Sequence, residues 1–468
     1  MTKTSAFGFL PENDGKTNAA ALQQALNARG DVYVDLPGVY ALSDTVYIGD
    51  DTSLIFCSGA YVKREKNEEE TGCVIINEGA FRREYNHNIK LIGMRLICNG
   101  VQSDAYRVGC KKGILGISAH AAFHYVKNLE IRGFEVHDLP EKDFGIQVCT
   151  FENILIENGV IEGLKDGVHL GTGRGFTIRH MKFRTFDDPI ALNAHDYAVS
   201  NPEMGWIEDG IIEDCYDLDD DSTTGFFCRI LAGSWGEWKK GMTVQNSDSV
   251  VYGGKIYRAF MPADGKHYIA NAAPDENVGK ANSDGIVWCI TQENTVTNCG
   301  CRNIVFRDIF LKKHRPTAFS FHFDRDAYSR SYYPNTEAPV QENISFEHIY
   351  CQNEIPVLLV SRTPVRHIRF TDCVLNGNRV VLENLKTPGI AYPVADIGFD
   401  RTAFYGKSQR LADADKGIKM CLSVDNSFAD DDFKAEIGGN IEVKKCDISL
   451  EKTEYKTVKD SFTGDIAD

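Results

Sequence analysis

Basic residues are scarce in this sequence of 468 residues, and no run of five or more of them occurs. Lys and Arg number 51 against 67 Asp and Glu, so the formal net charge is −16. Proteins whose main partner is a phosphate backbone or an anionic membrane surface carry basic clusters. We therefore expect neither nucleic acid nor a membrane among the partners, while the oligomeric state stays open.

Long apolar runs are also missing. No stretch approaches the roughly 18 residues that a membrane-spanning helix needs. The first residues, Met1 to Phe7, lack the apolar core of a signal peptide. The sequence as it stands predicts a cytoplasmic protein.

Cysteine pairs with the spacing of metal sites do not occur among the 14 Cys. No Cys-x-x-Cys is present, and Cys299-Gly-Cys301 is too tight for the usual zinc spacing. Several Cys lie inside apolar runs, as Cys98 does, which is typical of buried thiols in a reducing compartment. We expect no metal and no cofactor.

A short phrase recurs along the chain: a polar residue, often Asn, then Ile, Leu or Phe, any residue, and an apolar residue. Its copies begin at Asn88, Asn128, Asn153, Gly175, Asn303, Asn343, His367 and Asp396. The steps from 128 to 153 to 175 are 25 and 22 residues, and those from 343 to 367 to 396 are 24 and 29. Alternating strands at this period indicate a right-handed parallel β-helix, an all-β fold of stacked coils. A leucine-rich repeat is excluded because its Leu-x-x-Leu-x-Leu frame is absent.

Five segments follow from this pattern. Thr17 to Ala28 has helical periodicity and suits a cap over the open end of the first coil. The expected divisions are a cap with this helix (1–30), a first part of the β-helix (31–233), a small β insertion (234–296), a second part of the β-helix (297–410) and a C-terminal extension with weak strands (411–468).

Three acidic residues are spaced by one coil. Asp166 precedes Asp187 and Asp188 by 21 and 22 residues. Because stacked strands lie about 4.8 Å apart, one coil brings these carboxylates together, and at least one should then hold its proton to higher pH. A protonated carboxyl beside an ionised one is what cleavage of a glycosidic bond requires. The alternative is that Asp166-Gly and Asp187-Asp-Pro are ordinary turn residues.

The same residues resemble a known family. Asp14-Gly-Lys-Thr-Asn-Ala-Ala-Ala-Leu resembles the first segment of pectin-lyase-like β-helix proteins. Asp166-Gly-Val-His and Phe186-Asp-Asp-Pro-Ile-Ala resemble two motifs of family 28 glycoside hydrolases, the polygalacturonase group. The resemblance implies inverting hydrolysis, with Asp187 as the general acid and with Asp188 and Asp166 activating water.

Other motifs of that family are changed. Lys165 stands where the family has Thr, and Phe226 replaces the His of a Gly-His-Gly motif. The Arg-Ile-Lys motif that grips a uronate carboxylate is missing. We therefore expect an exo-acting glycosidase on short plant or microbial oligosaccharides, with little activity on polygalacturonate.

Further residues are candidates for substrate binding because the repeat would place them along the same groove. They are His169, His195, Arg229, His322 and Arg325, with Trp235 and Trp238 of the insertion as aromatic faces for sugar rings. Asp248 to Tyr257, closed by Trp288, resembles the small chitin-binding modules of chitinases. The aromatic residues could equally form a small core.

Two other function classes remain open. A β-helix polysaccharide lyase would use a Ca²⁺-binding acid cluster and an Arg or Lys base, and Asp217 to Asp221 is an acidic run of that kind. A glycan-binding or tailspike-like protein would bind sugars without cleaving them.

Overall fold

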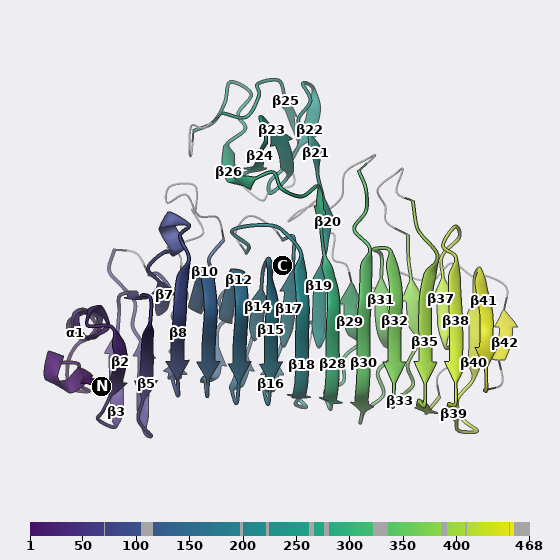
Figure 1. The fold of residues 1–468 in the computed structure, drawn as a ribbon, viewed down its shortest axis with the longest axis horizontal. Coiled ribbons are helices and arrows are strands. Elements are labelled where there is room, and N and C mark those ends of the chain that lie inside the picture. Colours follow the sequence, from purple (N-terminus) through teal and green to yellow (C-terminus); the bar gives the residue numbers. More distant parts are fainter. Residues whose placement is uncertain are drawn as a thin grey trace.

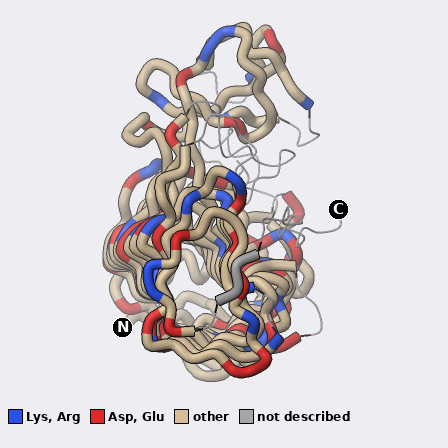
Figure 2. Tube along the Cα trace, turned by 90° about the vertical axis from the view of Figure 1, so that its right-hand side faces the viewer, with Lys and Arg blue, Asp and Glu red and all other residues tan. Residues whose placement is uncertain are grey.

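The fold is the parallel β-helix that the repeat predicts. The computed structural model describes residues 1–69, 71–103, 116–196, 200–220, 224–261, 266–275, 280–321, 336–384, 391–407, 410–448 and 450–453. Among these, 34 strands join into one continuous sheet in which every pairing is parallel. Figure 1 shows the coils stacked side by side along the long axis of the molecule, and Figure 2 looks along the stack, where the coils superimpose.

Each coil contributes strands to three faces. Face 1 consists of β4 (Val46–Ile48), β7 (Ile75–Asn77), β14 (Val168–Leu170), β17 (Ile190–Asn193), β19 (Cys228–Leu231), β29 (Thr317–Phe321), β31 (Val357–Ser361), β34 (Val380–Leu382), β37 (Ala412–Ala414), β40 (Ala435–Gly438) and β42 (Leu450–Thr453). Face 2 consists of β1 (Thr2–Lys3), β2 (Gly30–Val34), β5 (Thr52–Phe56), β8 (Asn86–Ile92), β15 (Gly173–Arg179), β32 (Val365–Thr371), β35 (Ala395–Asp400), β38 (Met420–Asp425) and β41 (Ile441–Cys446). Face 3 consists of β3 (Gly38–Leu42), β6 (Ala60–Arg64), β9 (Arg95–Ile97), β11 (Glu135–Leu139), β13 (Val160–Gly163), β16 (Lys182–Thr185), β33 (Val374–Asn376), β36 (Ala403–Tyr405) and β39 (Phe428–Ala429).

Five longer strands turn a corner and belong to two faces. They are β10 (Ala119–Arg132) and β12 (Phe144–Glu157), which join faces 1 and 2, and β18 (Ile207–Asp217), β28 (Cys301–Leu311) and β30 (Gln341–Cys351), which join faces 2 and 3.

The recurring phrase marks a corner of the coil. Its Asn residues adopt left-handed backbone angles, with φ between 54° and 58° at Asn88, Asn128, Asn153, Asn303 and Asn343. Asn tolerates this conformation better than other non-glycine residues. The side chains also bond along the stack, for example from Asn153 Nδ2 to Asn128 Oδ1 over 2.8 Å. One residue type therefore makes the corner and links successive coils.

The interior is filled by the inward-facing residues of the phrase. Ile304, Ile344, Ile368 and Ile397 lie in register on successive coils. Two residues further on, aromatic rings stack at 4.6–5.0 Å in the row Phe306, Phe346, Phe370 and Phe399. Stacked apolar rows of this kind bury a continuous core that no single coil could form.

The outside of face 2 carries rows of alternating charge. One row, in register across six coils, is Arg132, Glu157, Arg179, Glu213, Arg307 and Glu347. Its ion pairs include Arg179 to Glu157 at 2.6 Å and Arg307 to Glu347 at 2.8 Å. Opposite charges on facing strands favour this register over a shifted one, which would place like charges together.

The helix α1 (Gly15–Asn27) lies at the N-terminal end of the stack (Figure 1). Asp14 begins it by accepting a hydrogen bond from Thr17 N over 2.7 Å. Its buried residues, Leu22 and Leu26 among them, pack toward β3 and β4. That α1 protects the open end of the first coil stays a prediction. Two short 3-10 helices, Thr4–Phe7 and Ala80–Arg82, complete the helical elements among the described residues, and no described helix is long and apolar enough to cross a membrane.

A small β insertion stands away from the stack (Figures 1 and 2). Its stem is the antiparallel pair β20 (Gly233–Ser234) and β27 (Asn298–Cys299). Beyond the stem lie a four-stranded sheet and a two-stranded sheet with a core of their own that includes Tyr257 and Trp288. The strands are β21 (Gly236–Glu237), β22 (Met242–Val244), β23 (Ser249–Tyr252), β24 (Lys255–Ala259), β25 (Tyr268–Ala270) and β26 (Trp288–Glu293).

Candidate active site

The acidic residues lie in the turns that lead from face 3 into face 1. The strand pairing places four residues, one per coil, at the same position of this turn: Phe144, Asp166, Asp188 and Phe226. One residue earlier, Lys165 and Asp187 share a position. The backbone holds this stacking, because Gly167 N donates to Asp188 O over 2.9 Å. The one-coil spacing in the sequence therefore corresponds to direct stacking in space.

Three carboxylates meet in these turns. One oxygen each of Asp166, Asp187 and Asp188 can be chosen so that all three lie within 4.8 Å of one another. Asp166 and Asp188 are fully buried, whereas the Asp187 side chain is 10% exposed. Asp187 is thus the member of this acid cluster that a molecule at the surface would meet first.

Two cations lie within the acid cluster. Lys165 Nζ bonds to Asp187 Oδ2 and lies 3.7 Å from Asp166 Oδ1. Arg229 Nε lies 2.8 Å from Asp188 Oδ2, and its Nη2 lies 3.7 Å from Asp166 Oδ2. Burying a charge is costly unless it is paired, so these cations explain how acids can be buried side by side.

The two buried acids, Asp166 and Asp188, have pKa values shifted in opposite directions. Burial favours the neutral form of Asp166, but the charges of Lys165 and Arg229 and the hydrogen bond with His169 outweigh it and lower the pKa of Asp166. For Asp188, burial and the neighbouring carboxylates prevail over Arg229 and raise the pKa to about 8. At neutral pH the acid cluster therefore holds one proton beside an ionised carboxylate.

His169 lies against the acid cluster on β14. Its Nδ1 is 3.2 Å from Asp166 Oδ2, and its ring stacks on Phe144 with 4.1 Å between centroids. On its other side, Nε2 lies 3.8 Å from Asp196 Oδ2. The ring is buried and held between two carboxylates, so it orients Asp166.

Two buried basic residues, Arg315 and Lys313, bind the backbone of the turn that carries Asp187. Arg315 binds Asp217 through Nε at 2.6 Å and Nη2 at 3.0 Å, and it donates to the backbone carbonyls of Thr185 and Asp187. Lys313 Nζ donates to Thr185 O over 2.8 Å, and burial together with the Arg315 charge lowers its pKa to about 8. These two residues lie some 130 residues from the turn and belong to no recognisable motif, so no sequence pattern pointed to them.

The coil that follows Asp188 also fixes the position of the Asp188 carboxyl group. Phe226 N donates to Asp188 Oδ1 over 2.8 Å. This approach requires Gly225, because a Cβ there would lie only 2.4 Å from the carbonyl carbon of Asp187. Phe226 thus fixes Asp188 through its backbone N–H.

Other predicted binding residues lie apart from the acid cluster. His195 is fully buried and stacks on Trp235 at 6.0 Å, and burial and the Arg258 charge lower its pKa well below the usual value. Trp235 is only 2% exposed and presents no face to a ligand. Trp238 is half-buried in the insertion and contacts Tyr252 edge to face at 5.6 Å. The candidates His322 and Arg325 lie outside the described residues.

Comparison with known proteins supports the fold. No protein-family model matches the sequence, and no curated protein matches it. Among solved structures, gene product 12 of bacteriophage phi29, in its pre-mature form, aligns with 97% of this chain at 12% identity and a TM-score of 0.52. The alignment covers 56% of the phage protein, so this chain spans little more than half of its length.

Two further solved structures align with most of this chain at lower TM-scores. A family 28 exopolygalacturonase of Yersinia enterocolitica aligns with 98% of this chain and 79% of its own at 11% identity and a TM-score of 0.41. The surface adhesin PfbA of Streptococcus pneumoniae aligns with 93% of both chains at 13% identity and a TM-score of 0.45. At such identities a likeness shows the fold alone. The chain is therefore a parallel β-helix protein, as the pairing of its own strands shows.

Proposed function

We propose that this chain is a glycoside hydrolase that acts from the end of short, neutral oligosaccharides. The observation that carries the proposal is the acid cluster, in which the protonated Asp188 lies beside the ionised Asp166. Both acids lie just before strands of face 1. Protonation of a leaving oxygen and activation of water are the two tasks of glycosidic cleavage. The acid cluster has a group in the right state for each.

The roles follow from burial and charge. Asp188 holds the proton, and the partly exposed Asp187 relays it to the glycosidic oxygen as the bond to the anomeric carbon breaks. Asp166, held ionised, accepts a proton from the water whose oxygen attacks that carbon. Lys165 then stabilises the carboxylate that Asp187 becomes.

A neutral sugar suits this site better than a uronate. A buried uronate carboxylate needs cations that are not already paired. Lys165 and Arg229 already contact the acids of the cluster. Three acids, two cations and one proton sum to zero charge, so the acid cluster offers a uronate no net attraction.

Buried hydrogen bonds of Gln147, on the N-terminal side of the acid cluster, support exo action. On the coil before Asp166, Gln147 faces outward in register with His169, yet it is buried. Its amide nitrogen donates to the carbonyls of Gly116 and Ser200, and its oxygen accepts from Ser118 N. These bonds close face 1 on the N-terminal side of the acids, so a glycan chain would end there.

The test is a screen of the purified protein on aryl-glycosides and on short neutral oligosaccharides. We expect turnover of at least one of them, and Asp187→Asn should lower kcat by at least about a hundredfold with little change in KM. Asp219→Asn, at an exposed acid of a neighbouring turn, is the matched control and should keep normal turnover. Near-normal turnover by Asp187→Asn, or a rapid loss of viscosity of polygalacturonate, would contradict the proposal.

The stereochemistry is a separate question. We propose inversion, as in the resembled family. One oxygen of each acid lies within 4.8 Å of the others, whereas the two carboxyl groups of inverting enzymes are usually roughly 6.5–9.5 Å apart. The attacking water would therefore lie to one side of the three carboxylates and not in the space between them. Proton NMR of the first product anomer decides, and retention would refute inversion without affecting hydrolysis.

A lyase is the second candidate, because Lys165 is of a residue type that lyases use as a base, although it would first have to give up the proton that its ion pair with Asp187 retains. The Ca²⁺ ion that such lyases use does not fit, since Lys165 and Arg229 already neutralise the carboxylates that would bind it. An ultraviolet-absorbing unsaturated product would establish the lyase. Glycan binding without any cleavage would instead favour a tailspike-like role.

A further inference from the structure

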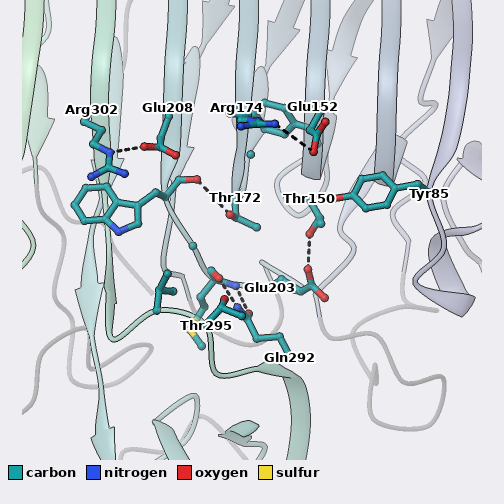
Figure 3. Close-up of a pocket in the computed structure, with 16 residues that line it drawn as sticks. Tyr85, Thr150, Glu152, Thr172, Arg174, Glu203, Glu208, Gln292, Thr295 and Arg302 are labelled. Atoms are coloured by element: carbon teal, nitrogen blue, oxygen red, sulfur yellow. Dashed lines mark hydrogen bonds and ion pairs between the residues drawn. The ribbon is translucent and has the colours of Figure 1, made fainter. Parts of the chain in front are cut away.

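A cleft lies between the outside of face 2 and the segment of the insertion from Gln292 to Val296, at the opposite end of the face 1 strands from the acid cluster. We call it the insertion cleft; its volume is about 380 Å³, near the lower end of the roughly 300–1,000 Å³ typical of small-ligand sites. It shares no residue with the acid cluster. Figure 3 shows its labelled residues, with Tyr85 and Arg302 at opposite ends.

The insertion cleft is framed by specific contacts. Gln292, near the end of β26, accepts from Met204 N over 2.8 Å and donates to Met204 O over 2.7 Å. Arg83 reaches across from the second coil to the carbonyls of Thr291 and Ile290. These bonds hold β26 against the segments that lead into face 2, so the part of the cleft lining that the insertion contributes has a fixed position.

Two aromatic rings line the insertion cleft. Arg302 lies 4.8 Å from the centroid of the half-buried Trp206 indole, and Lys127 lies 4.4 Å from that of the half-buried Tyr85 ring. Tyr85 is also fixed by an edge contact with Tyr125 at 5.0 Å. Rings held in this way present rigid apolar surface beside polar groups, which suits the alternating C–H and O–H surface of a sugar.

A buried carboxylate lies on the floor between the rings. Glu203 is 4% exposed, and its two oxygens accept from Tyr125 OH at 2.7 Å and Thr150 Oγ1 at 2.5 Å (Figure 3). Each carboxylate oxygen can accept a further hydrogen bond. Glu203 is therefore an oriented acceptor for a ligand hydroxyl.

The charges of the insertion cleft nearly cancel. Arg174 pairs with Glu152 at 3.8 Å, Arg302 pairs with Glu208, and Arg83 Nη1 lies 3.9 Å from Glu203 Oε1, so each acid of the lining has a cationic partner. An anionic ligand would therefore have to compete with these acids for the cations. From the rings, the oriented acceptor and the near-neutral lining, we propose that the insertion cleft binds a one- or two-residue unit of a neutral saccharide. This proposal does not rest on the proposed hydrolase activity.

The test is a binding titration by tryptophan fluorescence and calorimetry. The probes are cellobiose, xylobiose, mannobiose and lactose as neutral sugars, with digalacturonate as the anionic comparison. The protein carries Asp187→Asn, so that a sugar at the acid cluster is not cleaved. We expect saturable binding of at least one neutral probe, weakened about tenfold or more by Trp206→Ala and by Tyr85→Ala.

Tyr405→Ala is the matched control, because this exposed Tyr lies at the end of β36 on face 3 and does not line the cleft. It should leave the affinity unchanged, and Trp206→Phe should restore most of what Trp206→Ala loses. Thermal unfolding of each variant verifies the fold, and Tyr85→Ala carries the test if Trp206→Ala does not fold. Absence of binding by every neutral probe, affinity that is insensitive to both cleft variants, or tighter binding of digalacturonate would overturn the proposal.

Discussion

Replacing Arg229 by Met should destabilise the protein strongly and in a pH-dependent way. Arg229 contacts two fully buried carboxylates, Asp188 at 2.8 Å and Asp166 at 3.7 Å. Met keeps much of the side-chain volume but removes the charge. Removing one partner of a buried ion pair costs about 3–5 kcal/mol, because the other charge is left uncompensated.

The pH dependence follows from the pKa of Asp188, which is raised from 3.8 to about 8. A carboxyl whose pKa is raised by folding gives stability that is fully present below its unfolded pKa and is lost as the pH rises through the folded value. The Arg229 charge limits this loss, and it also helps to keep the pKa of Asp166 low. The cost of Arg229→Met should therefore be greatest above about pH 8, where all three acids are ionised, and should shrink toward about pH 5.

Denaturant unfolding of the two proteins at about pH 8.5 and about pH 5 measures this difference. Arg174→Met is the matched control, since this Arg is exposed on face 2 and its ion pair with Glu152 should contribute about 1 kcal/mol or less at either pH. A loss of less than about 1 kcal/mol at pH 8.5 for Arg229→Met, or an equal loss at both pH values, would refute the electrostatic account of the acid cluster.

Three other predictions follow from the structure. The kcat/KM of the hydrolysis should fall as the pH rises through about 8, because Asp188 then loses its proton. A flat profile in a series of buffers across that value would contradict this. Arg315→Lys should lower kcat about tenfold with little change in KM, since Lys cannot hold Asp217 and two backbone carbonyls together; steady-state kinetics with an unchanged melting temperature is the measurement, and a KM effect alone would argue against a positioning role. Asn303→Val should lower the free energy of unfolding by about 1–2 kcal/mol, whereas Asn303→Gly should cost less, because only the β-branched side chain opposes φ of 58°. Asn303 Nδ2 also donates to Asp209 Oδ1 over 3.0 Å. Equal losses in denaturant titrations would show that this bond, rather than the backbone angle, determines the stability there.

The fold was predictable because the sequence features that specify it lie within a single coil. Each copy of the phrase places a residue that tolerates left-handed angles at a corner and apolar residues facing inward, as at Asn343 and Ile344. The period between copies then determines that coils stack. No long-range information is needed when every coil packs on its neighbour.

The acids of the candidate site were also foreseeable, since one coil period separates Asp166 from Asp188 and stacking converts that period into contact. The cations were only partly visible. Lys165 stood out as a departure from the resembled family, and Arg229 as a residue of the next coil, but their pairing with the acids depends on the register of three coils.

The sequence by itself determined the repeat, the coil corners and the meeting of the three acids, because these depend on spacing within one or two coils. Only the tertiary structure decided which acid holds the proton, that Arg315 supports the turn, that His195 and Trp235 are buried, and that the insertion forms a cleft with face 2. The physical reason is that burial and charge pairing sum over neighbours contributed by segments far apart in the chain. The spacing of residues within one coil carries no information about those neighbours.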